Sequence, residues 1–236
     1  MAGSCCKGWF CVSTTSDCVI HSFYEMIYRS LFLPVFMLTI LLFCNGSVYH
    51  QDQAGNKKII YQESVFRNGD IIFQRGRNVA STFVVSVDSG SVYSHVGIIC
   101  KSKNHIFVIH ILPESNESKE GLVRREPLGD FLSPERTSGF ALYRLSDNKG
   151  TIPSRAVDVA TSFFKKRIHY DYDMDYKNHG KLYCTELVWW AYRMAHIDLI
   201  DGKYESVAFP FYKGKYILIS TLLKSRLLEK VSINPV

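Results

Sequence analysis

The clearest helical pattern in the sequence lies in Lys181-Leu182-Tyr183-Cys184-Thr185-Glu186-Leu187-Val188-Trp189-Trp190-Ala191-Tyr192-Arg193-Met194. Small and apolar residues recur at the spacing of one helical face, at Cys184, Leu187, Val188, Ala191, Tyr192 and Ala195. Gly180 and the polar run before it allow a helix to begin here. Glu186 would then place a negative charge in the first turn, at the positive end of the helix. The pattern predicts an amphipathic, largely buried helix with Cys184 at or near its first turn.

A cysteine at that position is a candidate nucleophile. The unpaired backbone N–H groups of a first helical turn favour the thiolate over the thiol. The same groups can stabilise an oxyanion on an attacked carbonyl. The alternative is a small buried hydrophobe, the commoner role of a free cysteine. A disulfide between Cys184 and Cys100 is a further alternative, and it would consume the thiol.

Two histidines lie on adjacent β-rich runs, 94–100 and 105–111, which are joined by a polar turn and predict a hairpin. If Ser102 and Lys103 form a two-residue turn, His95 lies directly opposite His110. Directly opposed side chains share one face of the sheet, with Cβ atoms about 5 Å apart. A loop longer by one residue would spoil this register.

Cys184, His95 and His110 therefore form the candidate site. A cysteine nucleophile needs a base nearby, and His95 can accept the thiol proton and later return it to the leaving group. His110 can orient the His95 ring through a hydrogen bond, as a carboxylate or amide does in other triads. A single histidine in a strand is more often an ordinary core or edge residue, and it is the combination of the three side chains that favours catalysis. The three side chains could instead hold a zinc ion, since cysteine and histidine are both zinc ligands.

Composition and charge limit the function classes. The chain is 47% hydrophobic and 21% charged, with a net charge of +6, which suits one globular domain with a good core. The first 44 residues carry two basic and two acidic side chains, so the net positive charge comes from the rest of the chain. Basic runs such as 165–167 are short, and we expect no nucleic-acid partner. Five of the seven cysteines precede residue 45. This distribution does not fit a disulfide-stabilised domain, and no cysteines have the paired spacing of a zinc finger.

The N-terminal residues predict export. We interpret residues 1–47 as a targeting region, 48–64 as a linker and 65–236 as the folded domain. The apolar segment 31–43 has about 13 residues, short for a spanning helix and typical of a signal-peptide core. Cys44 resembles the acylated cysteine of a bacterial lipoprotein, although Phe43 departs from the small residue preferred before it. An uncleaved membrane anchor and a translation start at Met26 are the alternatives.

The rest of the domain predicts a mixture of strands and helices. Short strands are expected at 71–73, 121–125 and 140–145, while 80–87 fits strand or helix. A helix is expected over 153–166 and a last helix within 217–231. The Asp- and Tyr-rich segment 170–176 lacks the glycine and terminal glutamate of a calcium loop. We expect it to line the cleft beside Cys184.

Three blocks together resemble one enzyme family. They are Asn68-Gly69-Asp70-Ile71-Ile72-Phe73, Tyr93-Ser94-His95-Val96-Gly97-Ile98 and Tyr183-Cys184-Thr185-Glu186-Leu187-Val188. They are similar to the blocks of the YiiX/YaeF-like permuted papain-fold amidases, within the wider NlpC-type cysteine hydrolases. The histidine block before the cysteine block is the mark of permuted members, and the likeness covers roughly residues 65 to 230.

The resemblance implies a circularly permuted papain-like α+β fold, with a small antiparallel sheet curved into a partial barrel against the cysteine-bearing helix. It implies Cys184 as nucleophile, His95 as base and a third polar residue on the following strand, at His110, with Glu114 as the fallback.

The function expected from this likeness is a cysteine hydrolase of the bacterial cell envelope that cleaves amide bonds in a lipid, a peptide or a cell-wall fragment. No cofactor or metal is expected. The alternatives are a lipid acyltransferase or (thio)esterase that uses the same thiol, because the pocket rather than the triad selects the acyl group. A membrane-tethered binding protein with an inert site is the alternative from another class.

Overall fold

The computed structural model describes residues 59–114, 120–146, 150–209 and 212–232. Residues 55–236 form one compact unit. The predicted targeting region 1–47, its apolar segment 31–43 and Cys44 lie outside the described residues, as does most of the predicted linker. In the part of the chain that is described, no helix combines the length and the apolar character that crossing a membrane requires.

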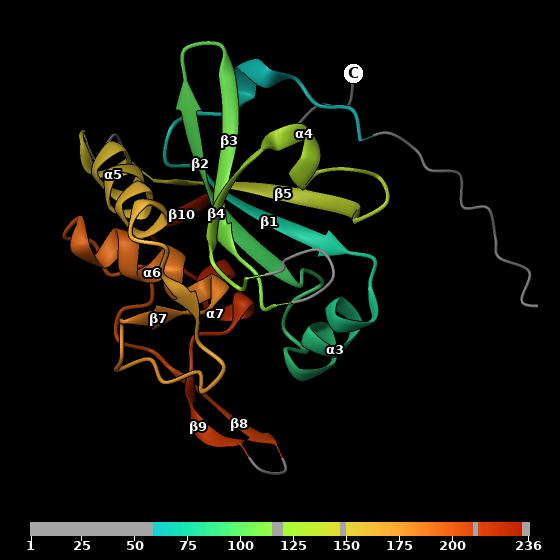
Figure 1. Ribbon diagram of the computed structural model, residues 1–236, viewed down its shortest axis with the longest axis vertical. Helices are drawn as coiled ribbons and strands as arrows, with labels where there is room; N and C mark the ends of the chain where they lie inside the picture. Colours follow the sequence, from blue (N-terminus) through green and yellow to red (C-terminus); the bar gives the residue numbers. More distant parts are fainter. Residues whose placement is uncertain (1–58, 115–119, 147–149, 210–211, 233–236) are drawn as a thin grey trace, which may run out of the picture. The chain divides into compact units, whose positions relative to one another are not determined.

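The described domain is built on one six-stranded antiparallel sheet, which is twisted and open (Figure 1). In spatial order its strands are β10 (Leu228–Val231), β5 (Thr137–Leu145), β1 (Ile71–Gly76), β2 (His95–Ser102), β3 (His105–Ile111) and β4 (Val123–Pro127). Two smaller pairs accompany it: parallel β6 (His169–Tyr170) with β7 (Lys181–Leu182), and the hairpin β8 (Glu205–Phe209) with β9 (Tyr212–Tyr216). The fold is α+β, as the sequence predicts.

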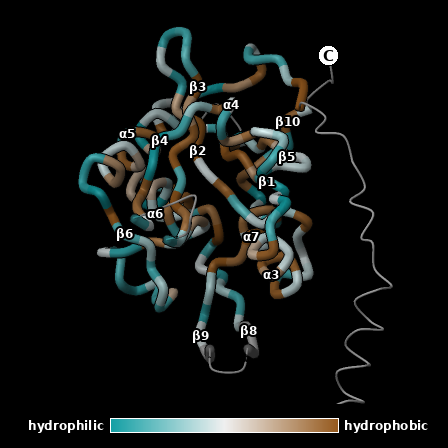
Figure 2. The backbone as a smooth tube through the Cα atoms, turned by 45° about the vertical axis from the view of Figure 1, so that its right-hand side comes forward, coloured by the Kyte–Doolittle hydropathy of each residue, from teal (hydrophilic) through white to brown (hydrophobic). Residues whose placement is uncertain are grey.

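Helices cover both faces of this sheet. The described helical elements are the 3-10 turn η2 (Glu63–Val65), α3 (Val79–Val87), α4 (Leu128–Phe131), α5 (Ile152–Lys165), α6 (Cys184–Met194) and α7 (Ile219–Leu223). The larger apolar cluster contains α5, α6 and α7, and the smaller one contains α4. Along β2, Val96 and Ile98 belong to the larger cluster and Ile99 to the smaller, as the period of two in a strand requires. Figure 2 shows apolar segments running through the strands.

The β2–β3 hairpin exists, but its predicted register is wrong by two residues. Ser102 pairs with His105, so the turn is Lys103-Asn104, and Lys103 has a φ of 46°. Because the shift is even, every side chain keeps its face. His110 consequently lies beside Gly97, two residues along β2 from His95. The two histidines are diagonal rather than direct neighbours on the α4 face of the sheet.

The block that precedes β1 fixes helix α6 to the sheet. Gly69 has a φ of +86°, and its carbonyl oxygen accepts a hydrogen bond from the buried hydroxyl of Tyr192 on α6. Asp70 is buried and accepts from Nε and Nη2 of Arg144 on β5, both at 2.7 Å. The Asn-Gly-Asp motif thus positions the cysteine-bearing helix and does not reach the candidate site.

The other predicted elements are confirmed with shifted ends. The predicted face of α6 is buried, and α5 begins and ends within one residue of its prediction, although Phe164 is exposed on α5. The last helix is shorter than expected, because Leu228 lies in edge strand β10 instead. The segment 80–87, for which the sequence allowed strand or helix, is helix α3.

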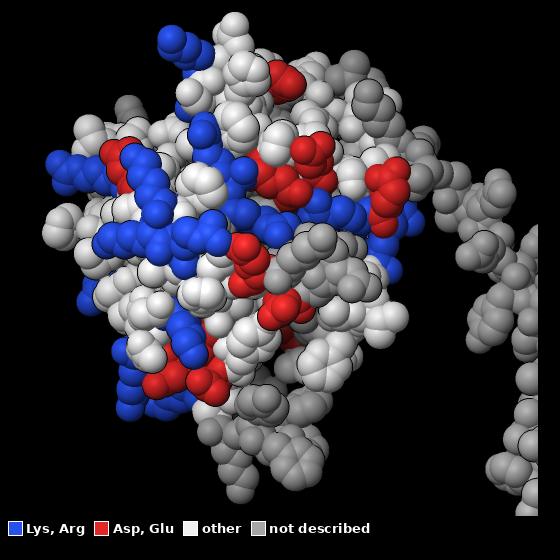
Figure 3. All heavy atoms as spheres, viewed as in Figure 1, with Lys and Arg blue, Asp and Glu red and all other residues white. Residues whose placement is uncertain are grey.

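Figure 3 shows Lys and Arg side chains in a band across one face of the molecule, with Asp and Glu beside them.

Candidate active site

Cys184 is the first residue of α6. Tyr183 before it is extended, with φ −103° and ψ 172°, and its side chain makes no capping hydrogen bond. The backbone N–H groups of Thr185, Val96 and Cys184 itself interact with the thiol. The β2–β3 ladder begins only at Ile98 opposite Ile109, so Val96 lies beyond it. The sulfur is therefore beside the residue that follows His95.

The state of this thiol differs from the sequence expectation. Burial raises the pKa of Cys184 to about 11, and the three backbone N–H groups lower it only in part. Burial disfavours the charged form of any acid, and here it outweighs the helix N-terminus. At neutral pH the resting site therefore holds a thiol rather than a thiolate. Cys184 and Cys100 are both free, so the Cys100–Cys184 disulfide does not form.

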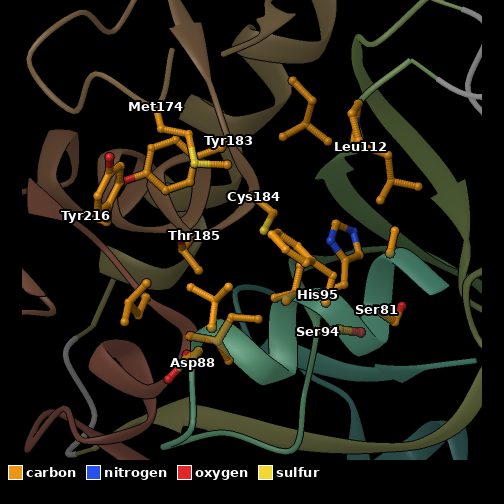
Figure 4. A pocket seen from close by; sticks show the side chains of 18 of the residues that line it. Ser81, Asp88, Ser94, His95, Leu112, Met174, Tyr183, Cys184, Thr185 and Tyr216 are labelled. Carbon is orange, nitrogen blue, oxygen red and sulfur yellow. The ribbon is translucent and has the colours of Figure 1, made fainter. Parts of the chain in front are cut away.

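His95 is the first residue of β2 and faces the same cavity as Cys184 (Figure 4). The thiol comes from the helix on one face of the sheet and the imidazole from the opposite face, and they meet where β2 begins. His95 is 5% exposed. Its Nε2 is 2.9 Å from Nδ1 of His110. Within the described residues, Nδ1 of His95 makes no hydrogen bond, so it is the nitrogen available to the cavity.

A line of polar side chains continues from His95 across three strands. Nε2 of His110 is 2.9 Å from Oε2 of Glu126, and Nη1 of Arg136 donates to Oε1 of Glu126 at 2.6 Å. His110 pairs with Arg124 across β3 and β4, so Glu126 is the diagonal neighbour of His110, as His95 is on the other side. The line His95–His110–Glu126 therefore runs diagonally over β2, β3 and β4, and Arg136 binds Glu126 at its end.

The charges along this line fix where the protons lie. Burial alone would raise the pKa of Glu126, but hydrogen bonds from His110 and Arg136 outweigh it and lower that pKa to about 2. An ionised Glu126 can only accept, so Nε2–H of His110 donates to it. The Nδ1 atom of neutral His110 then accepts from Nε2–H of His95. This leaves Nδ1 of His95 unprotonated and able to accept a proton in the cavity.

Both imidazoles are neutral at physiological pH. Burial lowers the pKa of His95 well below its ordinary value, and the positive charge of Arg136 lowers it further. Burial also lowers the pKa of His110, although Glu126 opposes this. A neutral imidazole is the form that acts as a base.

Apolar packing holds the two rings in place. Phe131 on α4 is fully buried, and its ring centroid lies 5.8 Å from that of His95 and 5.1 Å from that of His110. Gly97 stands opposite His110, where a Cβ atom would come within 2.5 Å of Val108 Cγ1 and 3.1 Å of His110 Cβ. The sequence block around His95 thus carries a glycine because the neighbouring imidazole and valine need its space.

The structure brings Cys184, His95 and His110 to one end of the sheet, and it adds two residues that the sequence analysis missed. Glu126 and Arg136 lie on β4 and in the loop after α4, and only strand pairing shows that they reach His110. Glu114, the fallback third residue, is exposed, and its backbone N–H donates to the hydroxyl of Tyr172.

The donor set does not suit a metal ion. Both ring nitrogens of His110 already have protein partners, so His110 has no nitrogen left for a metal. Across the described segments, no group of three His, Cys, Asp or Glu side chains is placed to hold an ion. Asp171 in the Asp- and Tyr-rich segment uses its carboxylate oxygens to accept from the backbone N–H groups of Asp173 and Asp175.

The cavity in front of Cys184 has a volume of about 580 Å³. It is lined from α3, the end of β3, the segments around Met174 and Tyr183, and the start of α7 (Figure 4). Tyr170, Tyr172 and Met174 all line it, so the predicted place of segment 170–176 beside Cys184 is confirmed.

Glu186 does not carry the charge that the sequence suggested. It is fully buried, and burial raises its pKa to about 9. Oε1 lies 2.9 Å from Nδ1 of His179, and among the described residues Oε2 has no hydrogen-bond partner. Glu186 is therefore a neutral acid inside the first turn of α6, two residues after the thiol.

Comparisons with known proteins agree with this architecture. The family model of the permuted papain-like amidase enzymes, YaeF/YiiX, matches residues 65–213. The crystal structure of the metalloprotein YiiX from Escherichia coli matches with a TM-score of 0.57 over 72% of this chain and 98% of that chain. Its sequence is 17% identical, so this likeness concerns the fold. No curated protein matches this chain in sequence.

Proposed function

The chain belongs to the YaeF/YiiX family of permuted papain-like amidases, and on that premise we propose that it cleaves amide bonds through an acyl-enzyme formed on Cys184. The observation that carries the proposal is the cavity shared by Cys184 and His95, with His95 held by His110 from behind. Nucleophile, base and orienting group are the parts that such a reaction requires.

The first half of the reaction forms a thioester. Sγ of Cys184 attacks the carbonyl carbon of the amide while the thiol proton moves to Nδ1 of His95. The raised pKa of the thiol makes this a concerted general-base step, because little thiolate exists beforehand. The backbone N–H of Cys184 stabilises the oxyanion. The C–N bond then breaks, and His95 returns the proton to the departing amine.

The second half releases the acid. Water takes the place of the amine and gives a proton to Nδ1 of His95 as its oxygen attacks the thioester carbonyl. The C–S bond breaks, the sulfur recovers its proton from His95, and a carboxylic acid leaves. His110 and the ionised Glu126 are positioning residues in both halves, because they keep Nδ1 of His95 free of a proton until it is needed.

Intact-mass measurement of the full chain after incubation with N-acyl amides tests this proposal. We expect an adduct with the mass of the acyl group, located to Cys184 by peptide mapping, and a free amine in the supernatant. Cys184→Ala should lose both, while Cys100→Ala, which removes the other cysteine of the domain, should keep both. Amide cleavage that persists in Cys184→Ala would refute the mechanism, and transfer of the acyl group to an alcohol or amine would identify an acyltransferase.

We also propose that this activity belongs to the bacterial cell envelope. The support is the apolar segment 31–43 and the cysteine that follows it at position 44. Cell fractionation and the intact mass of the mature protein test this. A mass that begins at Cys44 with added acyl groups fits a lipoprotein, whereas full-length protein in the cytosolic fraction contradicts export.

A further inference from the structure

The walls of the active-site cavity are largely apolar. Val84 and Val87 of α3, Leu112 and Pro113 after β3, and Ile219 of α7 contribute side chains to it. Helix α3 has no fully buried residue, and its Phe83 lines the cavity while remaining 53% exposed. The apolar wall therefore continues from the thiol to the mouth of the cavity. Apolar surface of this extent favours a hydrocarbon ligand.

Several polar groups of the same walls have partners within the protein. The hydroxyl of Thr185 donates to the carbonyl oxygen of Ile217, and the hydroxyl of Tyr183 accepts from the N–H of the same residue. Oδ2 of Asp88 accepts from the N–H of Ser220. These groups tie the wall together and are not arranged around a polar ligand.

The lining also lacks a cation. No lysine or arginine is among the described residues that line the cavity, and Asp88 is its single acidic residue. A peptide or cell-wall fragment with a carboxylate would bury that charge without a partner, which costs free energy. A hydrocarbon chain meets no such penalty, and each methylene group that it buries adds to binding.

We infer that the acyl group transferred to Cys184 carries a long hydrocarbon chain that lies along α3, so that the substrate is a fatty-acyl amide rather than a peptide. This inference rests on the proposed amidase function and specifies the substrate class of the same site. Val84 and Val87 contact the chain, and the amine leaves from the Cys184 and His95 side.

A chain-length series tests the inference. Acetyl, octanoyl and palmitoyl amides of one fluorogenic amine, kept below their micelle concentrations, share the leaving group and differ only in the chain. We expect kcat/KM to rise about tenfold or more from acetyl to palmitoyl. A dipeptide amide with a free carboxylate should react more slowly than the palmitoyl amide.

A matched pair of variants tests where the hydrocarbon chain of the substrate binds. Val84→Asp places a charge in the proposed acyl site, and Val85→Asp makes the same change one residue along α3, outside the cavity lining. Both valines are half-buried, and thermal unfolding of each variant shows whether it still folds. We expect Val84→Asp to lower kcat/KM about tenfold more for the palmitoyl amide than for the acetyl amide, and Val85→Asp to leave both within about twofold.

The outcomes separate this inference from the proposed function. Equal kcat/KM across the series, or equal effects of the two variants, would overturn the acyl site while the acyl-enzyme on Cys184 stands. A dipeptide amide that reacts fastest would overturn it in the same way. If no amide of any length acylates Cys184, the proposed function itself fails and the inference fails with it.

Discussion

Two histidine–glutamate pairs in this domain have the same hydrogen-bond length and opposite charge states. His110 and Glu126 lie 2.9 Å apart, as do His179 and Glu186. The pKa of Glu126 is lowered to about 2, whereas that of Glu186 is raised to about 9. The length of a hydrogen bond therefore does not reveal whether its carboxyl group is ionised.

The difference comes from the surroundings of each carboxyl group. Arg136 donates to Glu126 and compensates for its burial, so the carboxylate can stay charged. Glu186 is fully buried, and the charges that act on it are the carboxylates of Asp171 and Asp175, which oppose ionisation. One pair can therefore direct protons towards His95, while the other serves as a neutral packing element of α6. Three substitutions test this contrast.

Glu126→Gln should have the largest effect. The variant keeps the shape of the side chain but removes the negative charge that fixes the proton on Nε2 of His110. We expect kcat/KM for a fluorogenic acyl amide to fall about 100-fold, mainly through kcat. Glu114→Gln is the matched control, because it makes the same change at an exposed glutamate and should leave kcat/KM within about twofold. Equal activities of the two variants would remove Glu126 from the site.

Arg136→Met should have an intermediate effect that depends on pH. Without the guanidinium, the pKa of Glu126 rises from about 2 towards its ordinary range. A protonated Glu126 no longer accepts from His110, so activity should be lost as the pH falls through the new, higher pKa. A pH profile of kcat/KM measures this as an acidic limb displaced upwards. Arg167→Met, which breaks the exposed pair with Glu120, should leave the profile unchanged.

Glu186→Gln should affect catalysis least and stability in a pH-dependent way. Its folded-state pKa of about 9 lies above the value of about 4.3 expected for the unfolded chain. Between these values the folded state holds a proton that the unfolded state lacks. The contribution of Glu186 to the free energy of unfolding should therefore fall as the pH rises from about 4.3 to about 9.

The glutamine at position 186 stays neutral and can still donate to His179. Denaturant unfolding at several pH values should show the variant gaining about 4 kcal/mol relative to the wild type between pH 5 and pH 8. Activity should stay within about twofold. A stability difference between the variant and the wild type that stays constant over this range would show that Glu186 is ionised in the folded protein.

The sequence predicted what depends on local periodicity. The buried face of α6, the β2–β3 hairpin and the partnership of His95 with His110 follow from spacings of a few residues. The hairpin register was wrong by two residues, but an even shift keeps both imidazoles on one face, so the histidine pair survived the error.

What the sequence could not predict depends on distant packing. Glu126 reaches His110 only because β4 pairs with β3 across a long connection, and Arg136 arrives through the loop after α4. The charge states of Glu186 and Cys184 were predicted from the helix N-terminus alone. Burial by the sheet and by α7 decides both in the opposite direction, and burial is not a local property of the sequence.

The proposed mechanism requires the ring proton of His95 to lie on Nε2 and not on Nδ1. Nitrogen-15 NMR of histidine-labelled protein at pH 7 observes the position of this proton directly. Signals of His95 and His110 are identified by their loss in His95→Gln and His110→Gln. We predict that both rings are neutral with the proton on Nε2, so that Nδ1 of His95 is bare and faces the cavity of Cys184. A proton on Nδ1 of His95, or a charged His95 beside a Cys184 thiolate, would contradict the account.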